Sequence, residues 1–397
     1  MRSDTLPSLY ERLGIRPIVN AKGPSTRLSG PPMAAEVIEA MAMAARSCVD
    51  IVELQARASE AIARHTGAEA GLVTSGAAAG LLLGTAACVA GLDPAAMARL
   101  PDTRGLKHEV VMVRSQRNQY DHAVRAAGVT IVEVGLPDRY AGAGVRDAEP
   151  WEIDEAITER TAAILYVADP MSRPSLEAIV ATAHARGVPV LVDAAAQLPP
   201  AANLRRFIAD GADLVAFSGG KAIGGPQASG ILCGRQDLVM SAALQLFDMD
   251  YPDGFFTPPP AFIDRQRLKG LPPHGIGRGC KVGKEQIAGL LTALELFVAT
   301  DEASRRAPWL AAVRAVATGL AGVNGLELEL RDQLPVPELA IRPVAMAAAE
   351  LLRHLVTGEP AIHPDPGELD QGRILVRPTC LVAGDVDRIV DRLRSIG

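Results

Sequence analysis

Short apolar segments rich in β-branched residues recur along the chain, and they limit the fold more than any other feature. They predict buried strands at residues 109–113, 129–134, 161–167, 188–192, 214–217 and 230–233. Helical periodicity is found at residues 34–46, 53–65, 77–88, 121–127 and 176–186. Buried strands separated by helices are typical of a mainly parallel, doubly wound α/β sheet. The sequence therefore predicts a large α/β domain.

The remainder of the chain predicts a second, smaller domain. Residues 252–273 are proline-rich and irregular, and a long helical pattern follows at residues 284–299. Further strands are predicted near residues 326–330, 338–341 and 373–376, with helices near 345–355 and 385–395. We therefore expect an N-terminal arm over residues 1–30, a large domain over 31–283, and a connector helix with a small α+β domain over 284–397.

Charge and composition exclude several classes of partner and site. Lys and Arg number 40 against 46 Asp and Glu, and aromatic residues make up only 4%. The chain therefore lacks the basic surface and stacking platforms that nucleic acids require, and no nucleic-acid partner is expected. Its five cysteines never form a CxxC pair, so neither a disulfide framework nor a metal site is indicated. Residues 1–14 lack the apolar core of a secretory signal, so a cytoplasmic protein is expected.

A stretch without any charged residue runs from Ala70 to Leu92. It is long enough to cross a bilayer, but glycines dilute its hydropathy and no Lys or Arg cluster flanks it, so no membrane partner is expected. The segment GLVTSGAAAG reads as a strand, a Thr-Ser-Gly turn and a helix start, where backbone N–H groups and the helix dipole favour a phosphate. The phosphate candidates are Thr74, Ser75, Gly76 and Ala77, although an ordinary helix start would show the same pattern.

Two further segments carry groups with catalytic potential. Asp193 stands at the carboxyl end of a predicted strand, where α/β sheets build ligand crevices. Lys221 lies twenty-eight residues later in a glycine-rich turn, with Ser218 three positions before it. A lysine that forms a Schiff base and an aspartate that keeps a pyridinium nitrogen protonated suit pyridoxal phosphate. Alone, Asp193 could be a cap and Lys221 a solvated charge; the order of phosphate loop, Asp and Lys favours the cofactor site.

Several motifs resemble one enzyme family. The segments VDIVELQARASEAIARHTGAEAGLVTSGAAAG, QRNQYDHAVRAAG, VLVDAAAQLPP, LVAFSGGKAIGGPQASGIL and GRGCKVGKEQIAGLLTALE are similar to the selenocysteine synthase (L-seryl-tRNA selenium transferase)-related group. Within that group the resemblance is to the D-glucosaminate-6-phosphate ammonia-lyase branch. It implies a fold-type I pyridoxal phosphate enzyme, like aspartate aminotransferase and class V aminotransferases, with a mainly parallel seven-stranded sheet and a smaller C-terminal α+β domain.

Two departures from the selenium transferases bear on the reaction. The residues ahead of Leu54 leave no room for their N-terminal tRNA-binding domain, and Gly220 replaces the aspartate of their usual SGDK motif. Selenium transfer to a seryl-tRNA is therefore not expected.

The resemblance also implies roles for residues outside the central motifs. Gln119, Tyr120 or His122 would cover the cofactor ring, and Gln197 would lie near a cofactor oxygen. The anionic substrate would be held by Arg117, by Arg278 with Lys281 and Lys284 beside it, and by Arg377 in preference to Arg373. For Arg278 and its neighbours, ordinary solvated charges at a helix start remain the alternative, and His122 could equally lie on the surface.

The predicted function is an enzyme of amino-acid metabolism that acts on an α-amino acid. Lys221 is released from its Schiff base and removes the Cα proton, while Asp193 keeps the ring protonated. We expect α,β-elimination from a 2-amino-3-hydroxy acid, phosphorylated or sugar-derived, with release of ammonia. Racemisation or epimerisation, transamination, selenium transfer and a cofactor-binding scaffold without turnover remain as alternatives. The resemblance implies at least a homodimer.

Overall fold

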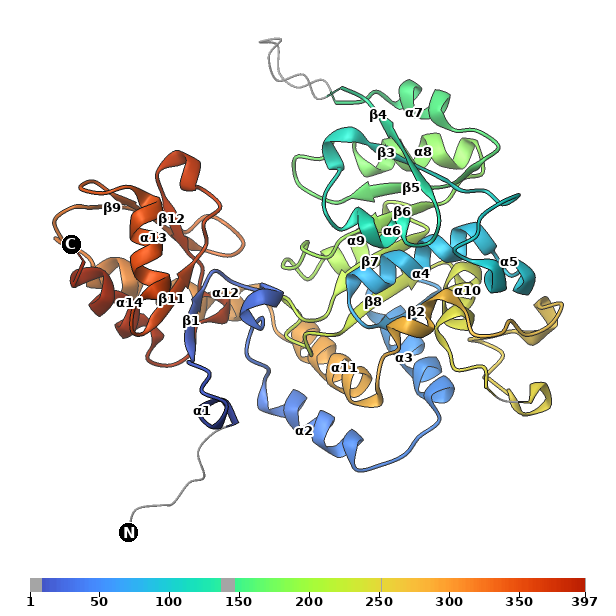
Figure 1. Cartoon of the computed structure of the whole chain (residues 1–397), viewed down its shortest axis with the longest axis horizontal. Coiled ribbons are helices and arrows are strands. Elements are labelled where there is room, and N and C mark those ends of the chain that lie inside the picture. Colours follow the sequence, from blue (N-terminus) through green and yellow to red (C-terminus); the bar gives the residue numbers. More distant parts are fainter. Residues whose placement is uncertain (1–8, 137–146, 251, 397) are drawn as a thin grey trace. The chain divides into compact units, whose positions relative to one another are not determined.

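The computed structural model describes residues 9–136, 147–250 and 252–396; the first eight residues of the expected N-terminal arm lie outside these ranges. The chain divides into two compact units (Figure 1). The larger unit is Met33–Ala299, and the smaller unit combines the residues up to Pro32 with Thr300–Gly397. The two ends of the chain therefore build one unit together.

This division differs from the one expected at residues 31 and 284. Helix α11 (Lys284–Ala299), expected as a connector, belongs to the larger unit and packs against α2 (Ala35–Ala45). Its apolar side chains Ile287, Leu290 and Leu294 are fully buried in the core of that unit. The N-terminal segment is likewise part of the smaller unit rather than a separate arm.

Seven strands form the central sheet of the larger unit, in the order β2-β8-β7-β6-β5-β3-β4. The strands are β2 (Ala70–Thr74), β3 (Glu109–Val113), β4 (Thr130–Val134), β5 (Thr161–Val167), β6 (Val190–Asp193), β7 (Leu214–Ser218) and β8 (Gly230–Gly234). Only β8 runs antiparallel to its neighbours β2 and β7, and the other paired strands are parallel. The prediction of a mainly parallel α/β sheet is confirmed.

Helices cover both faces of this sheet. The remaining helices of the unit are α3 (Ile51–Thr66), α4 (Ala77–Ala90), α5 (Pro94–Arg99), α6 (Asp121–Arg125), α7 (Pro150–Ala156), α8 (Leu176–Ala185), α9 (Asn203–Ala209) and α10 (Gln236–Leu246). A Cβ on Gly80 of α4 would lie 3.4 Å from that of Ala216 on β7. The next residue of that strand, Phe217, makes a ring contact with Phe207 of α9. Because adjacent strand residues point to opposite faces, α4 and α9 lie on opposite sides of the sheet.

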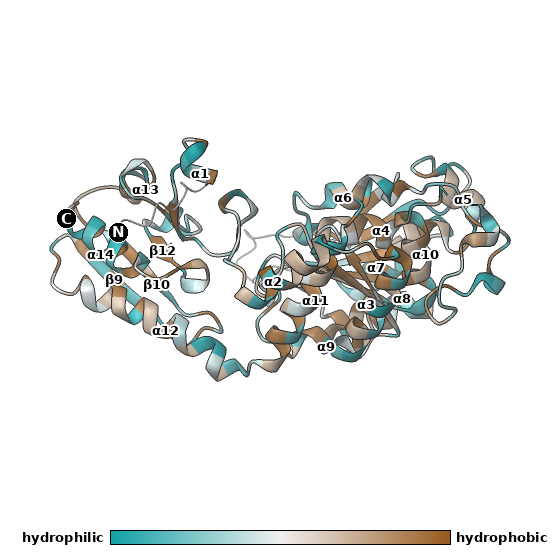
Figure 2. Cartoon of the chain, turned by 90° about the horizontal axis from the view of Figure 1, so that it is seen from below, coloured by the Kyte–Doolittle hydropathy of each residue, from teal (hydrophilic) through white to brown (hydrophobic). Residues whose placement is uncertain are grey.

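Burial of α4 explains the charge-free stretch. Eleven of its fourteen residues are buried, and α4 lies among the apolar elements of the larger unit (Figure 2). Gly84 brings the helix close to the sheet, since a Cβ there would lie 3.1 Å from Leu191 on β6. Within the described ranges, no helix combines the length and hydropathy that a membrane span would need.

The smaller unit contains two sheets. Strands β9 (Leu326–Arg331), β10 (Glu338–Pro343) and β12 (Ile374–Val376) are antiparallel with β10 in the middle, and β1 (Ile18–Ala21) pairs in parallel with β11 (Ala361–Pro364). The helices are α1 (Leu9–Arg12), α12 (Glu302–Gly319), α13 (Ala348–Thr357) and α14 (Asp385–Arg394). Val19, Ile341 and Leu351 belong to its hydrophobic core.

Candidate active site

The carboxyl edge of the central sheet brings Asp193 and Lys221 together. Asp193 ends β6, and Lys221 follows the end of the neighbouring parallel strand β7 by three residues. Ligand crevices in such sheets lie at this edge. The two groups come from separate segments, and only the parallel pairing of β6 with β7 places them side by side.

Both groups are titratable and lie in a poorly solvated environment. Asp193 is only 9% exposed, and its Oδ1 accepts a hydrogen bond from the backbone N–H of Ala195 at 3.0 Å. Burial raises the pKa of the Asp193 carboxyl, while this hydrogen bond and the positive charge of Lys221 oppose the rise. Burial also lowers the pKa of the Lys221 amine, and the charge of Asp193 opposes that fall. The lowered pKa of Lys221 favours the neutral amine, which is the form that accepts a proton.

Two glycines hold the turn that carries Lys221 in close contact with the chain beyond it. The Gly219 N–H donates to the Ser229 carbonyl at 2.9 Å, and the Gly225 N–H donates to the Gly219 carbonyl at 2.9 Å. A Cβ on Gly220 would lie 2.6 Å from the Cα of Gln227, which no side chain tolerates. In this conformation an aspartate could not replace Gly220, so the departure from the SGDK motif has a steric reason.

The predicted phosphate loop joins β2 to α4 in the same part of the sheet. Gly230 on β8 pairs with Thr74 on one side and with Ser218 on the other, so these residues form one row across three strands. With about 4.8 Å between neighbouring strands, Thr74 and Ser218 lie about 10 Å apart. The structure thus brings the Thr74 end of the loop and the strand that precedes Lys221 to the same edge.

The loop itself is tightly packed and presents main-chain donors. Gly76 is the N-cap of α4 with φ 117° and ψ 164°, a conformation that is essentially restricted to glycine. The Thr74 hydroxyl donates to the Gly76 carbonyl at 2.9 Å, and the Ser75 hydroxyl donates to the Cys280 carbonyl at 2.9 Å. Because both hydroxyl protons are used, the N–H groups at the start of α4, beginning at Ala77, are the donors left for a phosphate.

The predicted ring-covering segment follows β3 at the same edge. Gln119, Tyr120 and His122 are all exposed on the larger unit. The neighbouring Gln116 is instead buried, and its Oε1 accepts the Val167 N–H of β5 at 2.9 Å. Sequence reasoning missed this residue, which ties the ends of β3 and β5 together; a lone glutamine after a buried strand was its only signal.

Arg117 and Arg278, predicted to bind the substrate anion, both form ion pairs in the structure. The Nε of Arg117 lies 2.6 Å from Asp121 Oδ2, and its Nη1 pairs with Glu133. The hydrogen bond that Arg117 donates to the Asp121 carboxylate raises the pKa of the guanidinium. Arg278 Nη2 lies 2.9 Å from Asp248 Oδ2. Each arginine would have to share or exchange a carboxylate before it could bind a substrate anion.

A cavity of about 910 Å³ lies beside Arg278 and Lys281. The N-terminal turn of α3 and the aromatic segment 255–256 also line it, whereas Asp193 and Lys221 are not among its lining residues. The link to the phosphate loop is the Cys280 carbonyl, which accepts the Ser75 hydroxyl proton. Lys284 pairs with its neighbour Glu285.

The other predicted residues form hydrogen bonds or ion pairs within their own unit. The Gln197 N–H donates to the Ala194 carbonyl at 3.1 Å, and its carbonyl accepts from Asn203 Nδ2 at 2.7 Å, which closes the turn after Asp193. Arg377 belongs to the smaller unit, where it pairs with Glu338 and Asp365. Arg373 pairs with Glu368 and Glu329 there.

Comparison with known proteins places these motifs in a family. Residues 26–245 match the family model of L-seryl-tRNA selenium transferase. The chain is 31% identical to D-glucosaminate-6-phosphate ammonia lyase of Salmonella typhimurium over 98% of both proteins. It is 33% identical to 5'-C-glycyluridine monooxygenase-decarboxylase of a Streptomyces species, over 98% of this chain and 91% of that protein.

Solved structures agree with these matches. A structure of D-glucosaminate-6-phosphate ammonia-lyase aligns with a TM-score of 0.79 at 31% identity and covers 99% of this chain and 98% of its own. A cysteine desulfurase of Escherichia coli aligns over 91% of both chains with a TM-score of 0.53 at 18% identity, a likeness that bears on the fold alone. The fold is that of the fold-type I pyridoxal phosphate enzymes, as the sequence predicted.

Proposed function

Because the chain belongs to the L-seryl-tRNA selenium transferase family, we propose that it is a pyridoxal phosphate-dependent ammonia-lyase. The substrate would be a 2-amino-3-hydroxy acid, phosphorylated or sugar-derived, like the one named for the relative D-glucosaminate-6-phosphate ammonia lyase. The observation that carries the proposal is the placement of Lys221 and buried Asp193 after neighbouring strands, at the sheet edge that also holds the Thr74–Ala77 loop.

The residues present fit the cofactor. The α4 N-terminus offers N–H groups and a positive helix end to a phosphate dianion, and no charged side chain of the stretch Ala70–Leu92 opposes it. Gly76 leaves room there, because nothing lies within 4 Å of the position a Cβ would take. Asp193 would keep a proton on the pyridine nitrogen, and Ser218 and Gln197 would bind cofactor oxygens, with Gln119 or a neighbour over the ring.

Pyridoxal phosphate, when bound, supplies a sink for the electron pair left at Cα. Lys221 would take the Cα proton as a neutral amine, which its lowered pKa favours. Expulsion of the β-hydroxyl and hydrolysis of the released enamine then give a 2-keto acid and ammonia, so the water lost in elimination is regained in hydrolysis. Arg377, Arg117 and Arg278 would hold the carboxylate and any phosphate of the substrate.

The cofactor assignment is tested by colour and by covalent trapping. The purified protein should be yellow, and borohydride should fix the cofactor on Lys221, as peptide mass analysis would show. Lys221→Ala should be colourless. Lys107→Ala is the matched control, because Lys107 is exposed and precedes β3 at the opposite edge of the sheet. A colourless wild-type protein would contradict the proposal.

The reaction is tested with D-glucosaminate 6-phosphate and with D- and L-serine. Equal amounts of ammonia and 2-keto acid, formed without oxygen and without an added keto acid, are the expected result. Exchange of the α-proton without keto acid would favour a racemase or epimerase instead. Oxygen consumption with loss of the carboxylate would favour the reaction type named for the Streptomyces relative.

The proposal includes a cytoplasmic location and a homo-oligomer of at least two chains. Of these, the oligomer is what the resemblance to fold-type I enzymes implies. Light scattering of the purified protein would measure its mass against the 41.6 kDa of one chain.

A further inference from the structure

Three arginines and two carboxylates of the larger unit form a continuous network of ion pairs, here called the Arg117 cluster. The Nε of Arg117 lies 2.6 Å from Asp121 Oδ2, and its Nη1 pairs with Glu133. Asp121 Oδ1 also pairs with Arg125 Nε at 3.1 Å, and Glu133 Oε2 pairs with Arg114 Nε at 3.0 Å. Because each carboxylate is shared by two arginines, the guanidiniums of Arg114 and Arg125 flank that of Arg117.

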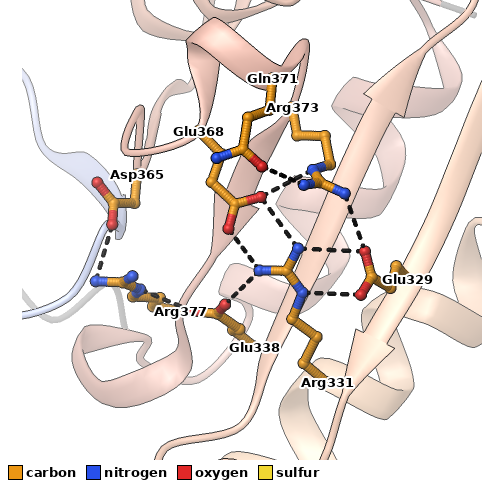
Figure 3. A network of polar contacts seen from close by, with 8 residues as sticks. All are labelled: Glu329, Arg331, Glu338, Asp365, Glu368, Gln371, Arg373 and Arg377. Atoms are coloured by element: carbon orange, nitrogen blue, oxygen red, sulfur yellow. Dashed lines mark hydrogen bonds and ion pairs between the residues drawn. The ribbon is translucent and has the colours of Figure 1, made fainter. Parts of the chain in front are cut away.

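The Arg117 cluster has one positive charge more than its two carboxylates neutralise. The network of the smaller unit differs, because four carboxylates there face three arginines (Figure 3) and Lys22 supplies a fourth cation. Donors also remain in the Arg117 cluster. Among the residues that the structure describes, nothing accepts from Nη2 of Arg117 or from the Nη groups of Arg114 and Arg125. Surplus positive charge and free guanidinium donors suit an anion such as a phosphate.

The two carboxylates of the cluster differ in burial. The side chain of Asp121 is 5% exposed, whereas that of Glu133 is 34% exposed. Asp121 therefore holds Arg117 and Arg125 from the protein side, and side chains that are already held lose less conformational freedom when they bind a ligand. A phosphate that arrives from solvent would compete with Glu133 and not with Asp121.

Strand register places the Arg117 cluster on the same face of the sheet as Asp193. Glu133 is in register with Met112, and Met112 is in register with Leu165. Leu165 is in turn in register with Leu191, which lies against α4. Asp193 follows Leu191 by two residues and therefore points to the same face. Glu133 and Asp193 are thus both on the α4 side of the sheet.

The cluster lies at a distance from the reacting groups. Strand β5 separates β6, which ends in Asp193, from β3, which precedes Arg117, so the two strands are about 10 Å apart. Gln116 accepts the N–H of Val167, the register partner of Asp193, and thereby fixes the start of the Arg117 segment at this edge. The Thr74–Ala77 loop follows β2, at the other end of the strand order. The loop and the cluster therefore lie on opposite sides of Asp193 along the sheet.

We propose that Arg114, Arg117 and Arg125 bind the distal phosphate of a phosphorylated substrate. Glu133 occupies this place until the phosphate displaces it, and Asp121 is a positioning residue. The inference rests on the proposed function, because reaction at Cα beside Lys221 leaves a phosphate at the far end of the substrate chain. A carboxylate bonded to Cα would stay beside Lys221 and would not reach the cluster.

The test measures phosphate recognition without turnover. Calorimetric titration of the yellow holoenzyme with 6-phosphogluconate and with gluconate gives two dissociation constants. The two compounds share one sugar-acid chain and differ only in the terminal phosphate, and neither has an amine that can react with the cofactor. The ratio of the two constants therefore reports the contribution of the phosphate alone.

We expect wild-type protein to bind 6-phosphogluconate at least about tenfold more tightly than gluconate, through charge-assisted hydrogen bonds. Arg114→Gln and Arg125→Gln should each reduce this ratio about threefold, the effect of one exposed ion pair. Glu133→Gln should increase the ratio, because the competing carboxylate is gone. The matched control is Arg104→Gln, which breaks an exposed ion pair with Asp102 ahead of β3, at the opposite edge of the sheet. It should leave the ratio unchanged.

The direction of the change in Glu133→Gln distinguishes a ligand site from a structural network. Loss of an ion pair that only supports the fold would weaken phosphate binding or leave it unchanged. Three results would overturn the inference: a wild-type ratio near one, a ratio in Glu133→Gln no higher than in wild type, and wild-type ratios in both Arg114→Gln and Arg125→Gln.

None of these results touches the proposed elimination reaction, which the yellow colour and the release of ammonia test separately. A colourless wild-type protein would instead overturn the proposed function, and this inference with it.

Discussion

The buried carboxylate of Asp193 is expected to destabilise the protein when no cofactor is bound. Burial raises its pKa above the ordinary value of 3.8. The folded state therefore disfavours the ionised form, so the penalty is present above the folded-state pKa and vanishes below about pH 3.8. We predict that Asp193→Asn makes the cofactor-free protein more stable at pH 7, by about 1–2 kcal/mol, the order of effect typical of a single buried substitution.

Urea unfolding of the cofactor-free proteins between pH 4 and pH 8 would measure this difference. The gain should shrink steadily as the pH falls toward 4. Asp370→Asn serves as the control because Asp370 is exposed. A variant Asp193→Asn that is less stable than wild type at pH 7 would contradict the argument. That result would mean that the Asp193 carboxylate stabilises the folded protein even without the cofactor.

Two substitutions in the phosphate loop test whether main-chain N–H groups or a side-chain hydroxyl bind the cofactor phosphate. Gly76→Ala should lower the free energy of unfolding by about 1–3 kcal/mol, because alanine is strained at this backbone conformation, and it should weaken cofactor binding. Ser75→Ala removes only the hydrogen bond to the Cys280 carbonyl, worth about 0.5–1.5 kcal/mol, and should bind the cofactor nearly as well as wild type. Titration of each cofactor-free protein with pyridoxal phosphate would measure this. Equal losses of affinity would show that the Ser75 hydroxyl turns to the phosphate.

At the scale of elements, helix α3 protects the free edge of the central sheet. Strand β2 lies at one edge of the sheet, yet Gln55 of α3 pairs with both backbone groups of Val73. Its Nε2 donates to the carbonyl at 2.8 Å and its Oε1 accepts the N–H at 3.0 Å. The Ser59 hydroxyl accepts the Gly71 N–H at 2.9 Å. These side chains satisfy an edge that would otherwise be open to another chain.

Gln55→Leu should therefore leave two buried backbone groups without partners. We expect it to lower the free energy of unfolding by about 2–4 kcal/mol and to weaken cofactor binding, since Thr74 follows Val73 directly. Urea unfolding and cofactor titration would measure the two effects. Gln266→Leu, at an exposed position, should change neither. Wild-type stability in Gln55→Leu would mean that water replaces the amide at this edge.

The regular elements of the larger unit could be predicted because their signals are local. The runs at 109–113 and 161–167 are apolar in themselves, and the structure has β3 and β5 at those residues. The pair β1–β11 could not be predicted, because each strand has four residues and its partner lies more than 340 positions away. Helix α12 escaped notice for another reason: Pro308 lies inside it and its apolar periodicity is weak.

In the candidate site, too, only the features with local sequence signals could be predicted. Asp193, Lys221 and the Thr74–Ala77 loop could be located because each follows or precedes an apolar strand. The carboxylates of Arg377 could not, because Glu338 and Asp365 reach it only through the pairing of β10 with β12 and the bridge to Leu375. From the sequence, these arginines were predicted to bind anions. Their carboxylate partners are distant in the sequence and come close only through the pairing of strands.

At the scale of the whole molecule, the smaller unit depends on both ends of the chain. Val19 and Ala21 of β1 are 1% and 0% exposed in its core, and β1 supplies the only strand that pairs with β11 among the described residues. The Asn20 side-chain amide also donates to the Leu28 carbonyl at 3.4 Å, which anchors the segment that follows β1 in the sequence. A fragment that starts at Thr300 would therefore expose apolar side chains and an unpaired strand edge.

We predict that residues 300–397 alone do not fold into this unit, whereas the same fragment fused through a flexible linker to residues 9–32 does. Amide dispersion in a ¹H–¹⁵N spectrum and cooperative urea unfolding would distinguish the two. Val19→Asp in the fused fragment is the control, because a charge at this buried position should abolish folding even though the linker and length are unchanged. A dispersed spectrum for residues 300–397 alone would show that the smaller unit folds without β1. Failure of the fused fragment would show that the smaller unit needs the rest of the chain, because β1 alone would not complete it.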